Sequence, residues 1–223
     1  EIMPSLVGSE MCIRDRLNDN MILGISWGNT MYHTVKAVKT SKNIPITVVP
    51  IMGAANVRTP ERDSLDLSKE LAYAYGGTYH YIYAPWFVNS EEVRDSLEQE
   101  PNIKGCLELA KNADIILTSV GSIVYKSWKS YLSTRDLYNL EKKGAIGHIG
   151  GHFYDMEGNE VITPFVNKMI GLGIEDIKNT ENVICVAGLE MKAEAILGAV
   201  RGGYINTLIT DEEAAKAVLA LCK

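Results

Sequence analysis

The chain has 223 residues, of which 46% are hydrophobic and 22% charged, so it is long enough for one domain with a full hydrophobic core. Its formal net charge of -6 argues against a nucleic-acid-binding surface within this segment, because such surfaces are normally basic. No apolar run reaches membrane-spanning length, and we expect a cytoplasmic protein without membrane contact.

The first residues differ in character from the rest of the chain. Residues 4–16 (PSLVGSEMCIRDR) resemble the translation of a sequencing adapter, and they show no periodicity that continues into the following residues. We therefore expect residues 1–17 to be a non-native leader and residues 18–223 to form the domain. On this expectation the chain is a fragment whose natural N-terminus is missing.

Strand-like and helix-like patterns alternate after this leader. Short apolar runs predict strands over residues 21–25, 46–52, 79–84, 113–120, 144–155, 182–187 and 207–209. Helical spacing with capping and stop residues predicts helices over residues 30–40, 64–75, 90–100, 101–112, 192–200 and 211–222. The alternation predicts an α/β fold with a Rossmann-like, mostly parallel sheet covered by helices on both faces.

Ligands of such sheets bind beyond the carboxyl ends of the strands. The first strand is followed there by GISWGNT, residues 24–30, which combines glycines with residues that commonly cap a helix. This stretch alone leaves open an ordinary capped turn and a phosphate site at a helix N-terminus. Lys192 begins a predicted helix at another strand end. The positive end of the helix dipole disfavours an ammonium there, whereas a bound phosphate would stabilise it.

Six stretches in order make residues 18–223 similar to the effector-binding domain of SorC/DeoR-type sugar-binding transcriptional regulators: GISWGNT, VVPIMG, ADIILTSVGS, GAIGHIGGHFYDMEG, VAGLEMKAEAILGAVRGG and LITDEEAAKAVL. The resemblance implies a fold like that of glucosamine-6-phosphate deaminase and ribose-5-phosphate isomerase. It implies a phosphorylated sugar effector, self-association as a dimer or tetramer, and no cofactor. DNA would be contacted only through an N-terminal helix-turn-helix domain that is missing here.

The resemblance also implies roles for individual residues. Phosphate contacts fall on Ser26, Gly28, Asn29, Thr30 and Lys192, and sugar contacts on Gly53 and His148. His148 stands where the family commonly has an acidic residue, which changes the hydrogen bonds offered to a sugar. Asp63 could accept hydrogen bonds from sugar hydroxyls or cap the helix that follows it.

Several alternatives remain open in the sequence. His148 and His152 would face the same side of one predicted strand, but no cysteine or carboxylate completes a metal site, so we expect none. Trp86 and Phe87 could line the pocket or an oligomer contact. A sugar-phosphate isomerase or deaminase on the same fold is the rival function, with His148 as its one candidate base. We expect a sensor rather than an enzyme.

Overall fold

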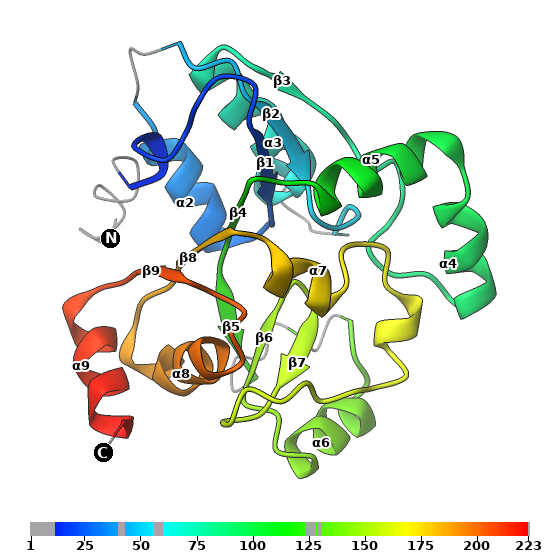
Figure 1. Ribbon diagram of the computed structural model, residues 1–223. Helices are drawn as coiled ribbons and strands as arrows, with labels where there is room; N and C mark the ends of the chain where they lie inside the picture. The colour runs from blue at the N-terminus through cyan, green and yellow to red at the C-terminus, as the bar shows by residue number, and fades with distance from the viewer. Residues whose placement is uncertain (1–11, 40–42, 56–59, 124–127, 129–130, 223) are drawn as a thin grey trace.

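A computed structural model describes residues 12–39, 43–55, 60–123, 128 and 131–222, and its architecture is α/β (Figure 1). The central sheet has six strands in the order β3-β2-β1-β4-β8-β9, and every neighbouring pair is parallel. This confirms the predicted parallel sheet. The strands are β1 (Ile22–Ile25), β2 (Thr47–Pro50), β3 (Thr78–Tyr79), β4 (Ile115–Thr118), β8 (Asn182–Val186) and β9 (Thr207–Ile209).

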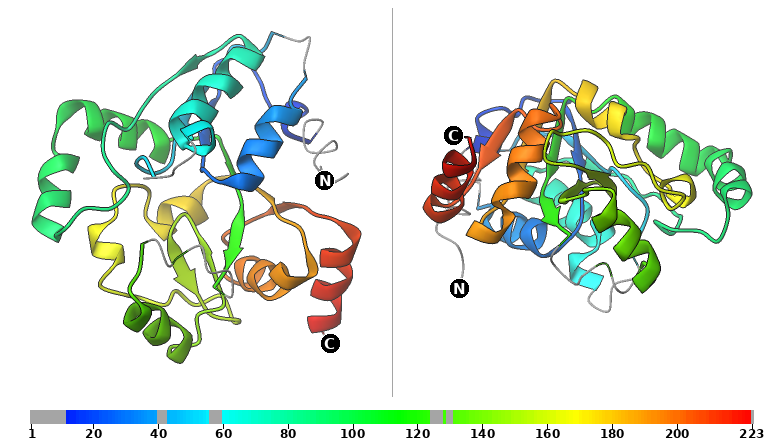
Figure 2. Two further views of the ribbon diagram at one scale, coloured as in Figure 1. Left: turned by 180° about the vertical axis from the view of Figure 1, so that it is seen from behind. Right: turned by 90° about the horizontal axis from the view of Figure 1, so that it is seen from below.

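Both faces of this sheet are buried, because successive residues of its strands enter different hydrophobic clusters. Ile115 and Leu117 of β4 pack on the face covered by α2 (Asn29–Ala37) and α3 (Ser64–Tyr75), whereas Ile116 packs on the other face. That second face is covered by α5 (Pro101–Lys111) and α7 (Ile174–Asn179), as the end-on view in Figure 2 shows. The layers are therefore helix, sheet and helix.

The remaining elements surround these layers. Helices α8 (Ala193–Arg201) and α9 (Glu212–Leu221) pack against each other beside β8 and β9, and α4 (Glu91–Glu98) extends next to α5 (Figure 1). Short turns of 3-10 helix in the described ranges include η1 (Pro60–Arg62), η3 (Val166–Lys168) and η4 (Glu190–Lys192). Within the described ranges, no helix is both long and apolar enough to cross a membrane.

Two of the predicted strands differ from the structure, because parts of them form a second, antiparallel sheet. It consists of β5 (Val120–Ser122), β6 (Gly147–Ile149) and β7 (His152–Tyr154), with α6 (Thr134–Lys142) beside it. The single strand predicted over residues 144–155 is a hairpin, because Gly150 (φ 58°) and Gly151 (φ 94°) turn the chain back. The strand predicted over residues 113–120 divides into β4 and β5, which pair with different sheets.

The third predicted strand is also shorter than expected. Of the predicted run 79–84 only Tyr79 pairs with β2, together with Thr78 before it, and the backbone N–H of His80 donates one more bond, to the carbonyl oxygen of Val48. Further along, the chain bridges instead to the loop after β2, where Ala54 pairs with Pro85. Beyond His80, the chain therefore contacts the loop after β2 and does not extend the sheet.

Helix boundaries agree closely with the capping signals in the sequence. Asp63, Ser90 and Asp211 each accept a hydrogen bond from a first-turn N–H group, at the starts of α3, α4 and α9. Gly76 ends α3 with φ 73°, the left-handed conformation that glycine adopts without strain.

The residues that sequence reasoning placed in a leader are partly inside the fold. Residues 1–11 lie outside the described ranges, but Ile13 is 0% exposed and Leu17 is 6% exposed. Both belong to the hydrophobic cluster that contains Leu23 and Ile25 of β1. Whether residues 1–17 are native to the protein stays a prediction, although their C-terminal part contributes side chains to the core.

A buried hydroxyl joins the small sheet to α8. Tyr154 is fully buried, and its hydroxyl donates to the carbonyl oxygen of Ala195 at 2.8 Å. Tyr154→Phe keeps the ring but removes this buried hydrogen bond, so we expect the free energy of unfolding in urea to fall by about 0.5–1.5 kcal/mol. Tyr138→Phe is the control, because that ring is 63% exposed. Equal losses in the two variants would show that the buried bond adds no stability.

Candidate functional site

The loop between β1 and α2 presents an uncapped helix N-terminus. Gly28 stands at the N-cap position with φ 123°, which favours glycine, and no side chain caps the helix. Of the two alternatives that the sequence left open for this stretch, the ordinary turn with a Ser, Asn or Thr side-chain cap is therefore not what forms. The first turn also contains no acidic residue, so the positive end of the helix dipole is not neutralised from within the helix.

The predicted phosphate donors in this loop differ in availability. The backbone N–H of Gly28 donates to the carbonyl oxygen of Arg62 at 3.1 Å, so a ligand would have to displace that bond. The N–H groups of Asn29 and Thr30 lie in the first turn, where the helix itself offers no acceptor, and they have none elsewhere among the described residues. These two N–H groups are therefore the open donors of the loop.

Ser26 connects this loop to the neighbouring strand end. It is 5% exposed, its hydroxyl accepts a hydrogen bond from Thr118 at 3.1 Å, and its N–H donates to Leu117 at 3.1 Å. Because β1, β4 and β8 are consecutive in the parallel sheet, the residues that follow them lie side by side at its carboxyl edge. The loop after β1 and the turn after β8 thus face a common region.

Lys192 comes from the turn after β8. Lys192 is the last residue of η4 and the N-cap residue of α8. The sequence predicted it as the first residue of that helix, which in the structure begins one position later. Its side chain is largely buried, which lowers the pKa of the ammonium, and it has no hydrogen bond or ion pair with any described residue. A largely buried, unpaired cation at a strand end is a natural position for an anionic ligand.

The turn that carries Lys192 is held from the other side by α9. Leu189 has φ 78°, an uncommon conformation for a non-glycine residue. Its N–H donates to Oδ2 of Asp211 at 2.8 Å, and Oδ1 of the same carboxylate accepts from Ala214 as the cap of α9. Asp211 therefore fixes both the cap and the turn, and acts as a positioning residue for Lys192.

His148 lies on β6 of the second sheet, close to Lys192. It pairs across β5 and β6 with Gly121, where any Cβ would overlap the ring nitrogen Nε2, so the glycine makes room for the imidazole. Burial, and beside it the charge of Lys192, lower the pKa of His148 to about 3. The ring is therefore neutral at physiological pH and offers a ligand one donor and one acceptor.

The hairpin separates the two histidines that sequence reasoning placed on one strand. His148 lies on β6 and His152 on β7, and His152 has its own partners. Its Nδ1 lies 3.0 Å from Oε1 of Glu160 and its Nε2 lies 3.0 Å from the carbonyl oxygen of Leu172. The idea that they face the same side of a single strand is wrong, because Gly150 and Gly151 turn the chain between them.

Two predicted sugar contacts have structural roles in the fold. A Cβ on Gly53 would lie 2.7 Å from the carbonyl oxygens of Ala84 and Pro85, so close backbone packing requires glycine there. Asp63 caps α3 by accepting from the N–H of Leu65, and burial raises the pKa of its carboxyl group. A ligand contact at either residue stays a prediction.

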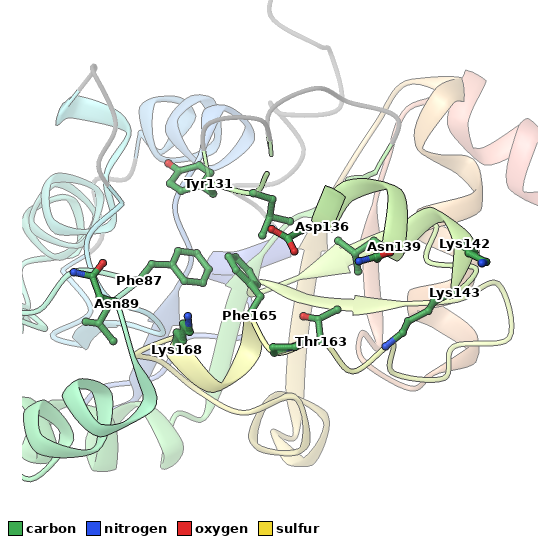
Figure 3. Close-up of a pocket in the computed structure, with 14 residues that line it drawn as sticks. Phe87, Asn89, Tyr131, Asp136, Asn139, Lys142, Lys143, Thr163, Phe165 and Lys168 are labelled. Atoms are coloured by element: carbon green, nitrogen blue, oxygen red, sulfur yellow. The ribbon is translucent and has the colours of Figure 1, made fainter. Parts of the chain in front are cut away.

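Aromatic residues from distant parts of the sequence meet beside this site. Trp27 packs edge-on against Trp86 at 5.0 Å, and Trp128 packs edge-on against His148 at 4.7 Å, both measured between ring centroids. Trp86 is 2% exposed and belongs to the core, whereas Phe87 lines a pocket of about 890 Å³ next to α6 (Figure 3). Sequence reasoning missed this pocket, because no periodic pattern connects the segments that form it.

The comparisons with known proteins agree with one another. A family model described as "Putative sugar-binding domain" matches residues 7–220. The chain is 27% identical over 215 residues to the uncharacterized transcriptional regulator YjhU of Escherichia coli (strain K12), covering 94% of this chain and 65% of YjhU. It is 28% identical over 209 residues to the deoxyribonucleoside regulator of Bacillus subtilis (strain 168), covering 93% and 67%. The chain thus spans about two thirds of the length of these relatives.

A solved structure shows the same fold. The full-length sorbitol operon regulator SorC from Klebsiella pneumoniae superposes with a TM-score of 0.93 at 23% identity, covering 98% of this chain and 73% of that chain. These relatives and this structural neighbour are transcriptional regulators, in agreement with a sensor rather than an enzyme. From the family match over nearly its whole length, this chain belongs to the sugar-binding domain family of SorC/DeoR-type transcriptional regulators.

Proposed function

We propose that this domain senses a phosphorylated sugar, whose phosphate lies between the N-terminus of α2 and the ammonium of Lys192. The observation that carries the proposal is the combination of an uncapped helix N-terminus with a largely buried, unpaired lysine at the same edge of the sheet. Each feature alone favours an anion, and together they provide N–H donors and a positive charge from two neighbouring turns.

The sugar would lie toward His148 and the loop after β2. A neutral imidazole beside Lys192 can exchange hydrogen bonds with hydroxyl groups without adding charge to the site. Gly53 and Asp63, near the ends of β2 and η1, are the further sugar contacts in this proposal, together with Ser26 and Thr30 as hydroxyl donors to the phosphate. The backbone N–H groups of Asn29 and Thr30 would donate directly, and that of Gly28 would donate once its bond to Arg62 is displaced.

In the whole regulator, effector binding would be read out elsewhere. Because the chain spans about two thirds of the length of its relatives, we propose that a separate segment contacts DNA. The effector would alter self-association of this domain and, through it, the affinity for DNA. The acidic balance of the chain is consistent with a sensing rather than a DNA-contacting role.

The first expected outcome concerns the phosphate group. Calorimetry should show that the domain binds one or more of ribose 5-phosphate, fructose 6-phosphate and glucose 6-phosphate, and binds the corresponding free sugar at least about tenfold more weakly. The reason is that charge-assisted hydrogen bonds to the phosphate are lost, and a tenfold difference corresponds to about 1.4 kcal/mol. Equal affinity for a sugar and its phosphate would contradict the proposal.

The second outcome concerns Lys192. Lys192→Met removes the charge and keeps most of the side-chain volume, so the affinity for the sugar phosphate should fall about ten- to a hundredfold, or ~1.5–3 kcal/mol. Thermal stability should change little, because the ammonium has no partner among the described residues. Lys216→Met, at an exposed lysine paired with Glu212 on α9, is the matched control. Binding of the Lys192 variant within about twofold of the parent would exclude this residue from the site.

The third outcome concerns pH. Because burial lowers the pKa of Lys192, its charge is lost at a lower pH than that of an ordinary lysine. The affinity of the parent protein for a sugar phosphate should therefore fall as the pH rises through this lowered pKa. Calorimetry in alkaline buffers, with Lys192→Met for comparison, measures this effect. An equally steep fall in the variant would assign the pH dependence to another group.

A further inference from the structure

The pocket next to α6 shares no lining residue with the strand-end site. It has a volume of about 890 Å³ and lies between α6, η3 and the segment that follows Trp86. Figure 3 shows Phe87 and Phe165 pointing toward one another at its centre, with Tyr131 nearby. A volume of this size is typical of pockets that hold small organic molecules.

The floor of the pocket is aromatic and closely packed. The ring centroids of Phe87 and Phe165 are 3.8 Å apart, and Tyr131 lies 6.1 Å from Phe87. Trp86 lies directly behind this floor, 4.3 Å from Phe87. The rings are tilted by 36° (Phe87 and Phe165) and 43° (Phe87 and Tyr131), so the floor offers an apolar aromatic surface against which a ring of a ligand can pack.

The walls of the pocket are mainly basic, in a chain whose net charge is -6. Three lysines line it against a single carboxylate, Asp136, which is held in the capping box of α6 by Ser133. Lys168 points toward the two phenyl rings from below, and Lys143 reaches in from the end of α6 (Figure 3). The ammonium of Lys168 has no hydrogen bond or ion pair with a described residue, although, beside the hydrogen bond with Ser90, its charge helps to lower the pKa of Glu92. The ammonium of Lys143 donates to the carbonyl oxygen of Ile162 at 3.0 Å.

An unsatisfied polar atom also lies in the lining. The hydroxyl oxygen of Thr163 is buried and has no hydrogen-bond partner in the described part of the chain. The indole nitrogens of Trp86 and Trp128, in the aromatic cluster behind the floor, are likewise buried and unpaired. Buried polar groups in native proteins are almost always hydrogen-bonded, so the hydroxyl of Thr163, the one of these groups that lines the pocket, is available to a ligand.

We propose that this pocket is a second ligand site, separate from the strand-end site, and that it takes a small organic anion with an aromatic or similarly flat apolar face. The apolar face stacks on Phe87 and Phe165, while the anionic group meets Lys168 and Lys143 and accepts a hydrogen bond from Thr163. The two sites are connected through the aromatic cluster, because Trp128 contacts Phe165 at 5.6 Å on one side and His148 at 4.7 Å on the other.

The test uses 1-naphthyl phosphate as the probe, with 1-naphthol and inorganic phosphate as its apolar and anionic halves. Calorimetry on the parent chain should show one site for 1-naphthyl phosphate and at least fivefold weaker binding of either half. Lys168→Gln should weaken 1-naphthyl phosphate at least threefold, and Phe165→Leu at least fivefold. Lys216→Gln is the control and should bind like the parent. Lys168 is exposed, so its variant tests the proposal even if Phe165→Leu fails to fold.

The Lys192→Met variant distinguishes this site from the strand-end site. If the proposal is right, Lys168→Gln loses affinity for 1-naphthyl phosphate while Lys192→Met keeps it, whether or not any sugar phosphate binds. A loss in Lys192→Met but not in Lys168→Gln would place the probe at the strand ends and overturn the proposal. No binding at millimolar concentration, or equal binding of 1-naphthol, would overturn it as well.

Discussion

The parallel alignment of β1, β4 and β8 is the constraint on which the candidate site depends. Because all three strands run in the same direction and are neighbours in the sheet, the chain must leave each of them at the same edge. The residues that follow, Ser26 after β1 and the turn before Lys192 after β8, are thereby brought together from positions far apart in the sequence. Burial of both faces leaves this edge as the place where polar groups can converge.

The small antiparallel sheet adds chemistry that the main sheet does not provide. It brings His148 over the strand ends, and it does so because Gly121 on the adjacent strand has no side chain to occupy that space. On the other side of the same hairpin, Tyr154 anchors the sheet to α8 through Ala195. The hairpin thus positions one neutral hydrogen-bonding side chain near the cation of Lys192 and is itself fixed by a buried hydroxyl.

Charge is distributed unevenly in this acidic chain. Around the proposed phosphate site, the first turn of α2 has no carboxylate, and Asp211 is occupied with the backbone of α9 and of the turn before Lys192, whereas Glu190 and Glu194 flank Lys192 in η4 and α8. The pocket beside α6 has the same character, since its one carboxylate is used as a helix cap. A local scarcity of free carboxylates would let the two proposed sites bind anions in a domain whose net charge is negative.

The sequence by itself determined the alternation of strands and helices, the caps at Ser90 and Asp211, and the stop at Gly76, because these depend on neighbouring residues. It left the cap of α3 open between Asp63 and Ser64, and the structure places it at Asp63. It also indicated the strand-end loops, since glycines and Lys192 follow apolar runs directly. Tertiary structure alone decided that residues 144–155 turn back as a hairpin, that Gly28 uses its N–H on Arg62, and that Phe87, Tyr131 and Phe165 line one pocket. Those outcomes depend on which distant segments meet, and contacts between distant segments leave no periodic pattern in the local sequence.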